Sequence, residues 1–148
     1  MTREDCMRRA LELAREAGQA GDIPVGCVIT GPDGSVIGEG RNRREEIHSA
    51  LAHAELEAIA AACRTIGSWR LENCTLYVTL EPCPMCAGAI LNARIPAVFF
   101  GAAEDQSGCC GSALDLFAEG LGPAPKVYGG LLEQECRALL SGFFQNLR

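Results

Sequence analysis

The sequence of 148 residues lacks any long hydrophobic run. No stretch of about 18 uncharged apolar residues occurs, which is the length that a membrane-spanning helix requires. The first residues, Met1-Thr2-Arg3-Glu4-Asp5, are charged where a secretory signal would be apolar. We therefore expect a cytoplasmic protein with no membrane partner.

The sequence also lacks an excess of positive charge. Its 13 lysines and arginines face 19 aspartates and glutamates, which gives a formal net charge of −6. Proteins that bind nucleic acids in general usually carry a basic surplus. The composition therefore argues against a general nucleic-acid-binding protein and leaves room only for a local basic patch.

Internal repeats, low-complexity tracts and long linkers are missing as well. The length suits one compact domain, and 48% hydrophobic and 22% charged residues are typical of a globular protein. We expect residues 1–148 to form a single domain.

Cysteine, by contrast, is abundant. Nine cysteines are present, an odd number in a chain that is too long for a small disulfide scaffold. Without an export signal we expect reduced thiols, so that closely spaced cysteines become candidates for metal binding.

The hydrophobic pattern predicts alternating helices and strands. Helical spacing of apolar residues occurs over 2–17, 54–66, 85–93 and 132–144, with a short helix near 113–119. Apolar, β-branched runs predict strands at 25–30, 36–37, 74–80, 97–100 and 127–128. A turn at Pro32-Asp33-Gly34 joins the first two strands into a hairpin. We expect a three-layer α-β-α sandwich with a mixed five-stranded sheet that is mainly parallel.

Two short motifs predict a metal centre. His53-Ala54-Glu55 and Pro82-Cys83-Pro84-Met85-Cys86 each lie at the start of a predicted helix. Two cysteines separated by two residues can direct both sulfurs at one point, and a helix N-terminus favours the thiolate. A catalytic zinc has three protein ligands and water in the fourth position. His53, Cys83 and Cys86 supply three such ligands.

The fourth position decides between a catalytic and a structural zinc. Five other residues are nominal candidates for a fourth ligand, but none has convincing spacing. They are His48, Cys63, Cys74, Cys109 and Cys110. Glu55 lies two residues after His53, close enough to the open position to exchange protons with a bound water. The alternative is a reduced cysteine pair buried as two small hydrophobic side chains.

The two motifs also carry a resemblance. H-x-E followed by P-C-x-x-C is the signature of zinc-dependent base deaminases. The chain resembles the cytidine deaminase superfamily and, within it, the family of bacterial tRNA adenosine deaminases. The resemblance extends over nearly the whole chain, including Pro24-Val25-Gly26, Arg41-Asn42, Gly67-Ser68-Trp69-Arg70-Leu71, residues 76–83, Met85-Cys86-Ala87-Gly88-Ala89 and Glu135-Cys136.

The resemblance implies a cytidine deaminase-like fold and a homodimer that converts adenosine to inosine at the wobble position of a tRNA anticodon loop. It implies one Zn²⁺ per chain on His53, Cys83 and Cys86, with Glu55 as the proton shuttle. Asn42 would hydrogen-bond the flipped base, although an asparagine there can also simply hold a turn. Backbone amides near Ala54 and Cys83 would steady the substrate.

Contacts to phosphates have to be local in a chain of this charge. The candidate arginines are Arg41, Arg43, Arg44 and Arg94. Because Glu45 and Glu46 follow directly, a plain solvated loop is the alternative for the first three. Trp69 is expected to fill the edge of the core and Cys109-Cys110 to pack within a loop.

Two other functions remain open. A deaminase of a free base or nucleoside, such as guanine, cytosine or adenosine, needs only a closed pocket, and the acidic charge favours it. A zinc-stabilised binding module without activity is the third possibility, but a structural zinc site has no use for Glu55 beside the metal. The match across loops favours the tRNA deaminase.

Overall fold

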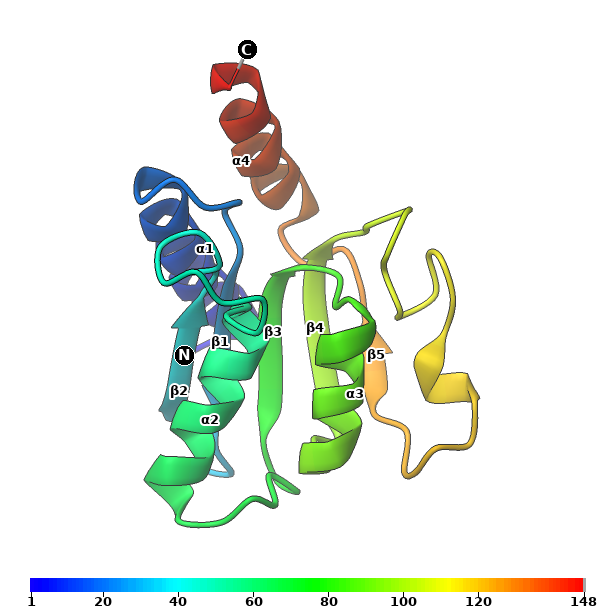
Figure 1. Cartoon of the computed structure of the whole chain (residues 1–148). Coiled ribbons are helices and arrows are strands. Elements are labelled where there is room, and N and C mark those ends of the chain that lie inside the picture. The colour runs from blue at the N-terminus through cyan, green and yellow to red at the C-terminus, as the bar shows by residue number, and fades with distance from the viewer. Residues whose placement is uncertain (148) are drawn as a thin grey trace.

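A central sheet with helices on both faces organises the protein (Figure 1). The computed structural model describes residues 1–147. Along the chain the elements are α1 (Arg3–Gln19), β1 (Gly26–Thr30), β2 (Val36–Arg41), α2 (Ala54–Ile66), β3 (Thr75–Leu80), α3 (Pro84–Ala93), β4 (Ala97–Ala102), η1 (Leu116–Ala118), β5 (Lys126–Tyr128) and α4 (Glu133–Asn146). The predicted three-layer sandwich is confirmed.

The five strands form a mixed sheet in the order β2-β1-β3-β4-β5. Strand β1 pairs antiparallel with both of its neighbours, β2 and β3. The pairs β3–β4 and β4–β5 are parallel. The parallel part of the sheet therefore comprises β3, β4 and β5, and their carboxyl ends lie at one edge.

Each face of the sheet has its own hydrophobic core. Helices α2 and α3 lie on one face, over buried side chains that include Ile29, Leu76 and Val98. Helices α1 and α4 lie on the other, over Val28 and Tyr77. Neighbouring residues of one strand belong to the cores on opposite faces of the sheet, because side chains alternate in direction along a strand.

A close approach between α2 and β2 fixes the start of α2. A Cβ atom at Gly40 would clash with the carbonyl oxygen of Ala54 and lie 2.7 Å from the backbone nitrogen of Ala58. Only glycine fits there without moving the helix. The N-terminus of α2, with His53 directly before it, is thereby held at the edge where β3 ends.

Three expectations about local structure are wrong. The first helix continues through Gly18 to Gln19, and the helix near 113–119 is a single turn of 3-10 helix at Leu116–Ala118, followed by positive-φ glycines. Trp69 is 55% exposed, whereas Leu71, two residues further on, is buried. The Arg70 guanidinium lies 4.6 Å from the centroid of the Trp69 ring.

None of the helices within residues 1–147 is long and apolar enough to cross a membrane.

Candidate active site

Both sequence motifs lie at helix N-termini, and the two helices pack side by side with these ends at the same edge of the sheet (Figure 1). His53 is the N-cap residue of α2 and Cys83 is the N-cap residue of α3, and neither side chain caps its own helix. Pro84 occupies the first turn of α3, where its missing N–H costs no hydrogen bond. The two N-cap side chains are therefore free to converge, and the helix ends favour negative charge between them.

The three predicted ligands form one cluster. The Sγ atom of Cys83 lies 3.6 Å from Nδ1 of His53, and the Sγ atom of Cys86 lies 3.5 Å from the same nitrogen. Zinc bonds of the usual length in tetrahedral geometry place nitrogen and sulfur ligands about 3.5 Å apart. The donor set and its spacing therefore fit a zinc ion, with Nδ1 as the histidine ligand. Within residues 1–147 this is the single His/Cys/Asp/Glu group compact enough to hold a metal.

The surroundings of Cys83 favour its thiolate. Hydrogen bonds from Cys86 and from His53 outweigh the effect of burial and lower the pKa of the Cys83 thiol to about 4. The hydrogen bond to Cys83 in turn raises the pKa of Cys86, and burial adds to this effect. A thiolate is the form in which cysteine binds a metal, so Cys83 is prepared for coordination.

Glu55 lies on the first turn of α2 beside this cluster. Its side chain is only 4% exposed, and burial raises the pKa of its carboxyl to about 7. A carboxyl group that titrates near neutral pH can both accept and release a proton during a reaction. Glu55 is not part of the ligand cluster, as expected of a proton-transfer group.

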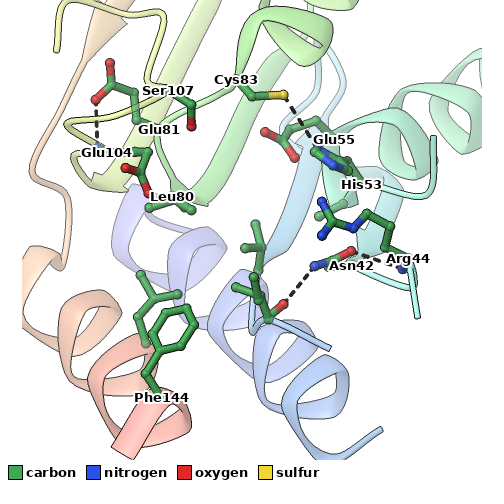
Figure 2. A pocket seen from close by; sticks show the side chains of 14 residues that line it. Asn42, Arg44, His53, Glu55, Leu80, Glu81, Cys83, Glu104, Ser107 and Phe144 are labelled. Carbon is green, nitrogen blue, oxygen red and sulfur yellow. Dashed lines mark hydrogen bonds between the residues drawn. The ribbon is translucent and has the colours of Figure 1, made fainter. Parts of the chain in front are cut away.

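A cavity of about 230 Å³ opens onto His53, Glu55 and Cys83. Figure 2 shows the Glu55 carboxylate beside the His53 ring and Cys83, with Phe144 on the opposite side. The volume lies just below the range of small-molecule pockets, which begins at about 300 Å³. The cavity therefore suits one planar ring system rather than a large ligand.

Three of the predicted substrate-binding residues line the cavity: Asn42, Arg44 and Ala54. The Nδ2 group of Asn42 donates to the carbonyl oxygen of Ile23 over 3.1 Å, and its Oδ1 accepts from the backbone nitrogen of Arg44. Asn42 thus holds the local turn and also faces the cavity. Both interpretations of this residue are compatible with its position.

Arg41 and Arg43 form ion pairs instead of facing the cavity. Arg41 lies 2.9 Å and Arg43 lies 2.7 Å from oxygens of Glu46. Arg43 also lies 3.6 Å from Glu57. The basic charge of these two arginines is therefore largely balanced within the protein.

Arg94 lies apart from the site, at the opposite end of α3. It is the C-cap residue, with a left-handed backbone, and its guanidinium donates to the carbonyl oxygen of Leu91 over 2.7 Å. A ten-residue helix is about 15 Å long. The structure does not bring Arg94 to the cavity with Arg44.

Several lining residues did not enter the sequence-based site. They lie at the end of β3 or directly after it, after β4, or on α4: Leu80, Glu81, Glu104, Ser107, Leu140 and Phe144. The first four lie at or just beyond the carboxyl ends of parallel strands, which is where ligands bind in α/β sheets. That rule could have indicated them, whereas no sequence signal places α4 beside the zinc site.

Comparison with known proteins shows the family to which this chain is similar. Residues 1–102 match the family described as cytidine and deoxycytidylate deaminase zinc-binding region. The tRNA-specific adenosine deaminase of Bacillus subtilis is 43% identical over 150 residues, covering 100% of this chain and 92% of its own.

Two solved structures share the fold. One comes from a study of A-to-I editing by tRNA:A34 deaminases at the wobble position; it has a TM-score of 0.90 and 42% identity, covering 93% of this chain and 100% of that chain. The other is guanine deaminase from Bacillus subtilis, with a TM-score of 0.67 and 42% identity over 80% of this chain and 74% of that chain. The predicted cytidine deaminase-like fold is confirmed.

Proposed function

We propose, from the premise that this chain belongs to the zinc-binding cytidine and deoxycytidylate deaminase family, that it converts adenosine to inosine at the wobble position of a tRNA anticodon. The observation that carries the chemistry is Glu55, a buried carboxyl outside the ligand set that lines the same cavity as His53 and Cys83. The full-length similarity to a tRNA-specific adenosine deaminase supports the substrate.

The metal ion and the side chains of the protein would each supply a part of the reaction. His53, Cys83 and Cys86 would hold one zinc ion, which supplies Lewis-acid activation of a water molecule. Glu55 would take both protons of that water in turn, delivering the first to the ring nitrogen of adenine and the second to the departing amine as the carbon–nitrogen bond breaks. Adenosine and water are thereby converted to inosine and ammonia.

A folded RNA loop can present one base to this cavity. Base-modifying enzymes extrude the target nucleotide into a closed pocket and hydrogen-bond its edge. The 230 Å³ cavity has room for one base, so affinity for a longer RNA has to come from the rim. Arg44 and Phe144 lie on that rim and would contact the phosphate backbone and a neighbouring base.

The net charge of −6 makes the rim contacts decisive. Within residues 1–147, Arg44 forms no ion pair, in contrast to Arg41 and Arg43. Its guanidinium is therefore available to a phosphate. We assign Arg44, together with Asn42 and the backbone at Ala54, to substrate binding.

The decisive experiment compares substrates. Purified protein is incubated with an adenosine-containing anticodon stem-loop, with free adenosine, and with free guanine, and inosine, xanthine and ammonia are measured. We expect inosine from the stem-loop at a kcat/KM far above that for free adenosine, and no turnover of guanine. Equal or better turnover of a free base or nucleoside would identify a small-molecule deaminase instead.

We also propose that the protein acts as a homodimer in the cytoplasm. A groove beside α2 and α3 is lined by apolar side chains, among them Leu56, Met85 and Leu121, and by the polar Asn92 and Arg94, and a second copy would cover it. All nine cysteines are free thiols in the structure, as a reducing compartment would keep them. Sedimentation analysis should give twice the mass of 15.7 kDa; a monomer at micromolar concentration would contradict the dimer.

A further inference from the structure

The loop of residues 104–112, here called the β4 loop, forms one wall of the cavity. It follows β4 and contributes Glu104 and Ser107 to the lining. Its backbone contacts the segment between β3 and α3, because the nitrogen of Cys109 donates to the carbonyl oxygen of Pro82 over 2.8 Å. The position of this wall therefore depends on what holds the loop against that segment.

The side chain of Glu81 holds the β4 loop against that segment. Oε1 accepts from the backbone nitrogen of Glu104 over 3.1 Å and from the hydroxyl of Ser112. Oε2 accepts from the backbone nitrogens of Cys110 and Ser112 over 2.9 and 3.2 Å. Figure 2 shows the bond between Glu81 and Glu104 beside Ser107. One carboxylate thus binds both ends of the β4 loop.

The loop is fitted closely around this carboxylate. Glu81 is 3% exposed, and a Cβ atom at Gly108 would lie 2.6 Å from its Oε1. Hydrogen bonds to a carboxylate are stronger than those between neutral groups, and a buried N–H without an acceptor is costly. Removing the carboxylate would therefore leave three backbone N–H groups and one hydroxyl of the loop without their acceptor.

Glu81 does not belong to the metal cluster, which consists of His53, Cys83 and Cys86. Its hydrogen-bond partners all belong to the loop and none of them is a ligand. An effect of Glu81 on the reaction would therefore pass through the cavity wall.

We propose that Glu81 is a positioning residue that holds the β4 loop where Glu104 and Ser107 complete the cavity, and so sets the affinity for the substrate rather than the chemistry at the metal. This inference rests on the proposed function, because the substrate whose affinity changes is the anticodon loop.

The first test compares Glu81→Ala and Glu81→Gln. Alanine removes every acceptor. Glutamine keeps one carbonyl oxygen for the nitrogens of Cys110 and Ser112 and can donate to the Ser112 hydroxyl, so that only the bond from Glu104 is lost. With the stem-loop as substrate we expect KM to rise about tenfold or more in Glu81→Ala, less in Glu81→Gln, and kcat to fall less than about threefold in both.

Ser112→Ala is the matched control, since it removes one of the four hydrogen bonds and leaves the Glu81 carboxylate in place. We expect a small rise in KM for this variant alone. In the Glu81→Ala background the same change should have no further effect, because its partner is already absent. Independent, additive effects would show that the two residues do not act through their shared bond.

Zinc content and amide hydrogen exchange complete the test. Glu81→Ala should keep about one zinc per chain, and exchange should become faster at Glu104, Cys110 and Ser112 with little change in α2. Loss of zinc, or a fall in kcat at unchanged KM, would overturn the proposal. Wild-type protein without turnover of the stem-loop would contradict the proposed function, whereas unchanged loop exchange in Glu81→Ala would contradict the role of Glu81 by itself.

Discussion

The Sγ atom of Cys86 lies 3.5 Å from Nδ1 of His53, although 33 residues separate the two in the chain. The Sγ atom of Cys83, the N-cap residue of α3, lies 3.6 Å from the same nitrogen. Two sulfurs that share one nitrogen neighbour at this distance define three corners of a tetrahedral zinc site. His53 and Cys83 also line the cavity that contains Glu55, so a zinc ion held by the three ligands would lie beside that carboxyl.

Zinc should therefore be present at about one ion per chain and should depend on these ligands. We expect Cys86→Ala to lose both zinc and activity, as measured by elemental analysis and by the stem-loop assay. Cys63→Ala is the control, because Cys63 lies near the end of α2, away from the cluster. Full zinc content in Cys86→Ala would contradict the ligand assignment.

Glu55→Gln should retain zinc and nearly all of its structure while turnover is lost. Glutamine has the shape of the acid but cannot carry the protons. General acid/base groups contribute about 100- to 10,000-fold, and one group serves several transfers here, so we expect the upper end. Single-turnover kinetics and zinc analysis on the same sample provide the measurement. Loss of zinc from Glu55→Gln would show that the carboxylate is a ligand instead.

The ligands and Glu55 could be predicted because each half of the site is local in sequence. His53 and Glu55 occupy one helix start, and Cys83 and Cys86 occupy another, so spacing alone indicates their chemistry. The other residues that line the cavity come from distant parts of the sequence, so spacing does not indicate them. Phe144 reaches the cavity only because α4 packs over the far face of the sheet, which is a matter of topology.

Arg43 and Arg44 show the same limit of prediction from sequence. Sequence places Arg43 and Arg44 side by side, and nothing local distinguishes them. The fold gives Arg43 two acidic partners, Glu46 and Glu57, and directs Arg44 to the cavity rim. Pairing of side chains from different elements decides which of two adjacent charges a substrate can use.

Arg44→Ala should therefore weaken binding of the anticodon stem-loop more than Arg43→Ala does. A lost phosphate contact reduces the dependence of log affinity on log salt concentration by about 0.7 for a single strand. Binding measured at several salt concentrations should give this smaller slope for Arg44→Ala and close to the wild-type slope for Arg43→Ala. Arg94→Ala should leave monomer–RNA contacts unaffected, because Arg94 lies at the far end of α3. Identical salt slopes for all four proteins would contradict the assignment of Arg44.

Two glycine substitutions test the packing that positions α2. Gly40→Ala places a methyl group against the backbone of Ala54 and Ala58, and overpacking of this kind costs about 1 to 3 kcal/mol of unfolding free energy. Gly142→Ala is the matched control: it lies inside α4, and a Cβ there meets nothing within 4 Å. Alanine should stabilise that helix by up to about 1 kcal/mol. Urea unfolding should give opposite signs for the two variants, and equal stabilities would show that α2 can move away from β2.

Burial of Glu55 predicts a pH-dependent stability of the zinc-depleted protein. Its pKa is raised from 4.5 to about 7, chiefly by burial, so that the folded state favours the protonated acid. The stabilisation from this preference is complete below pH 4.5 and is lost as the pH rises through 7. Glu55→Gln cannot ionise, so its unfolding free energy relative to wild type should increase over this interval and level off above pH 7, after a total change of about 3 kcal/mol. Urea unfolding of zinc-depleted protein between pH 5 and 8 measures this difference, with Glu45→Gln as the exposed control. A difference between Glu55→Gln and wild type that stays constant with pH would show that the Glu55 carboxyl is solvated rather than buried.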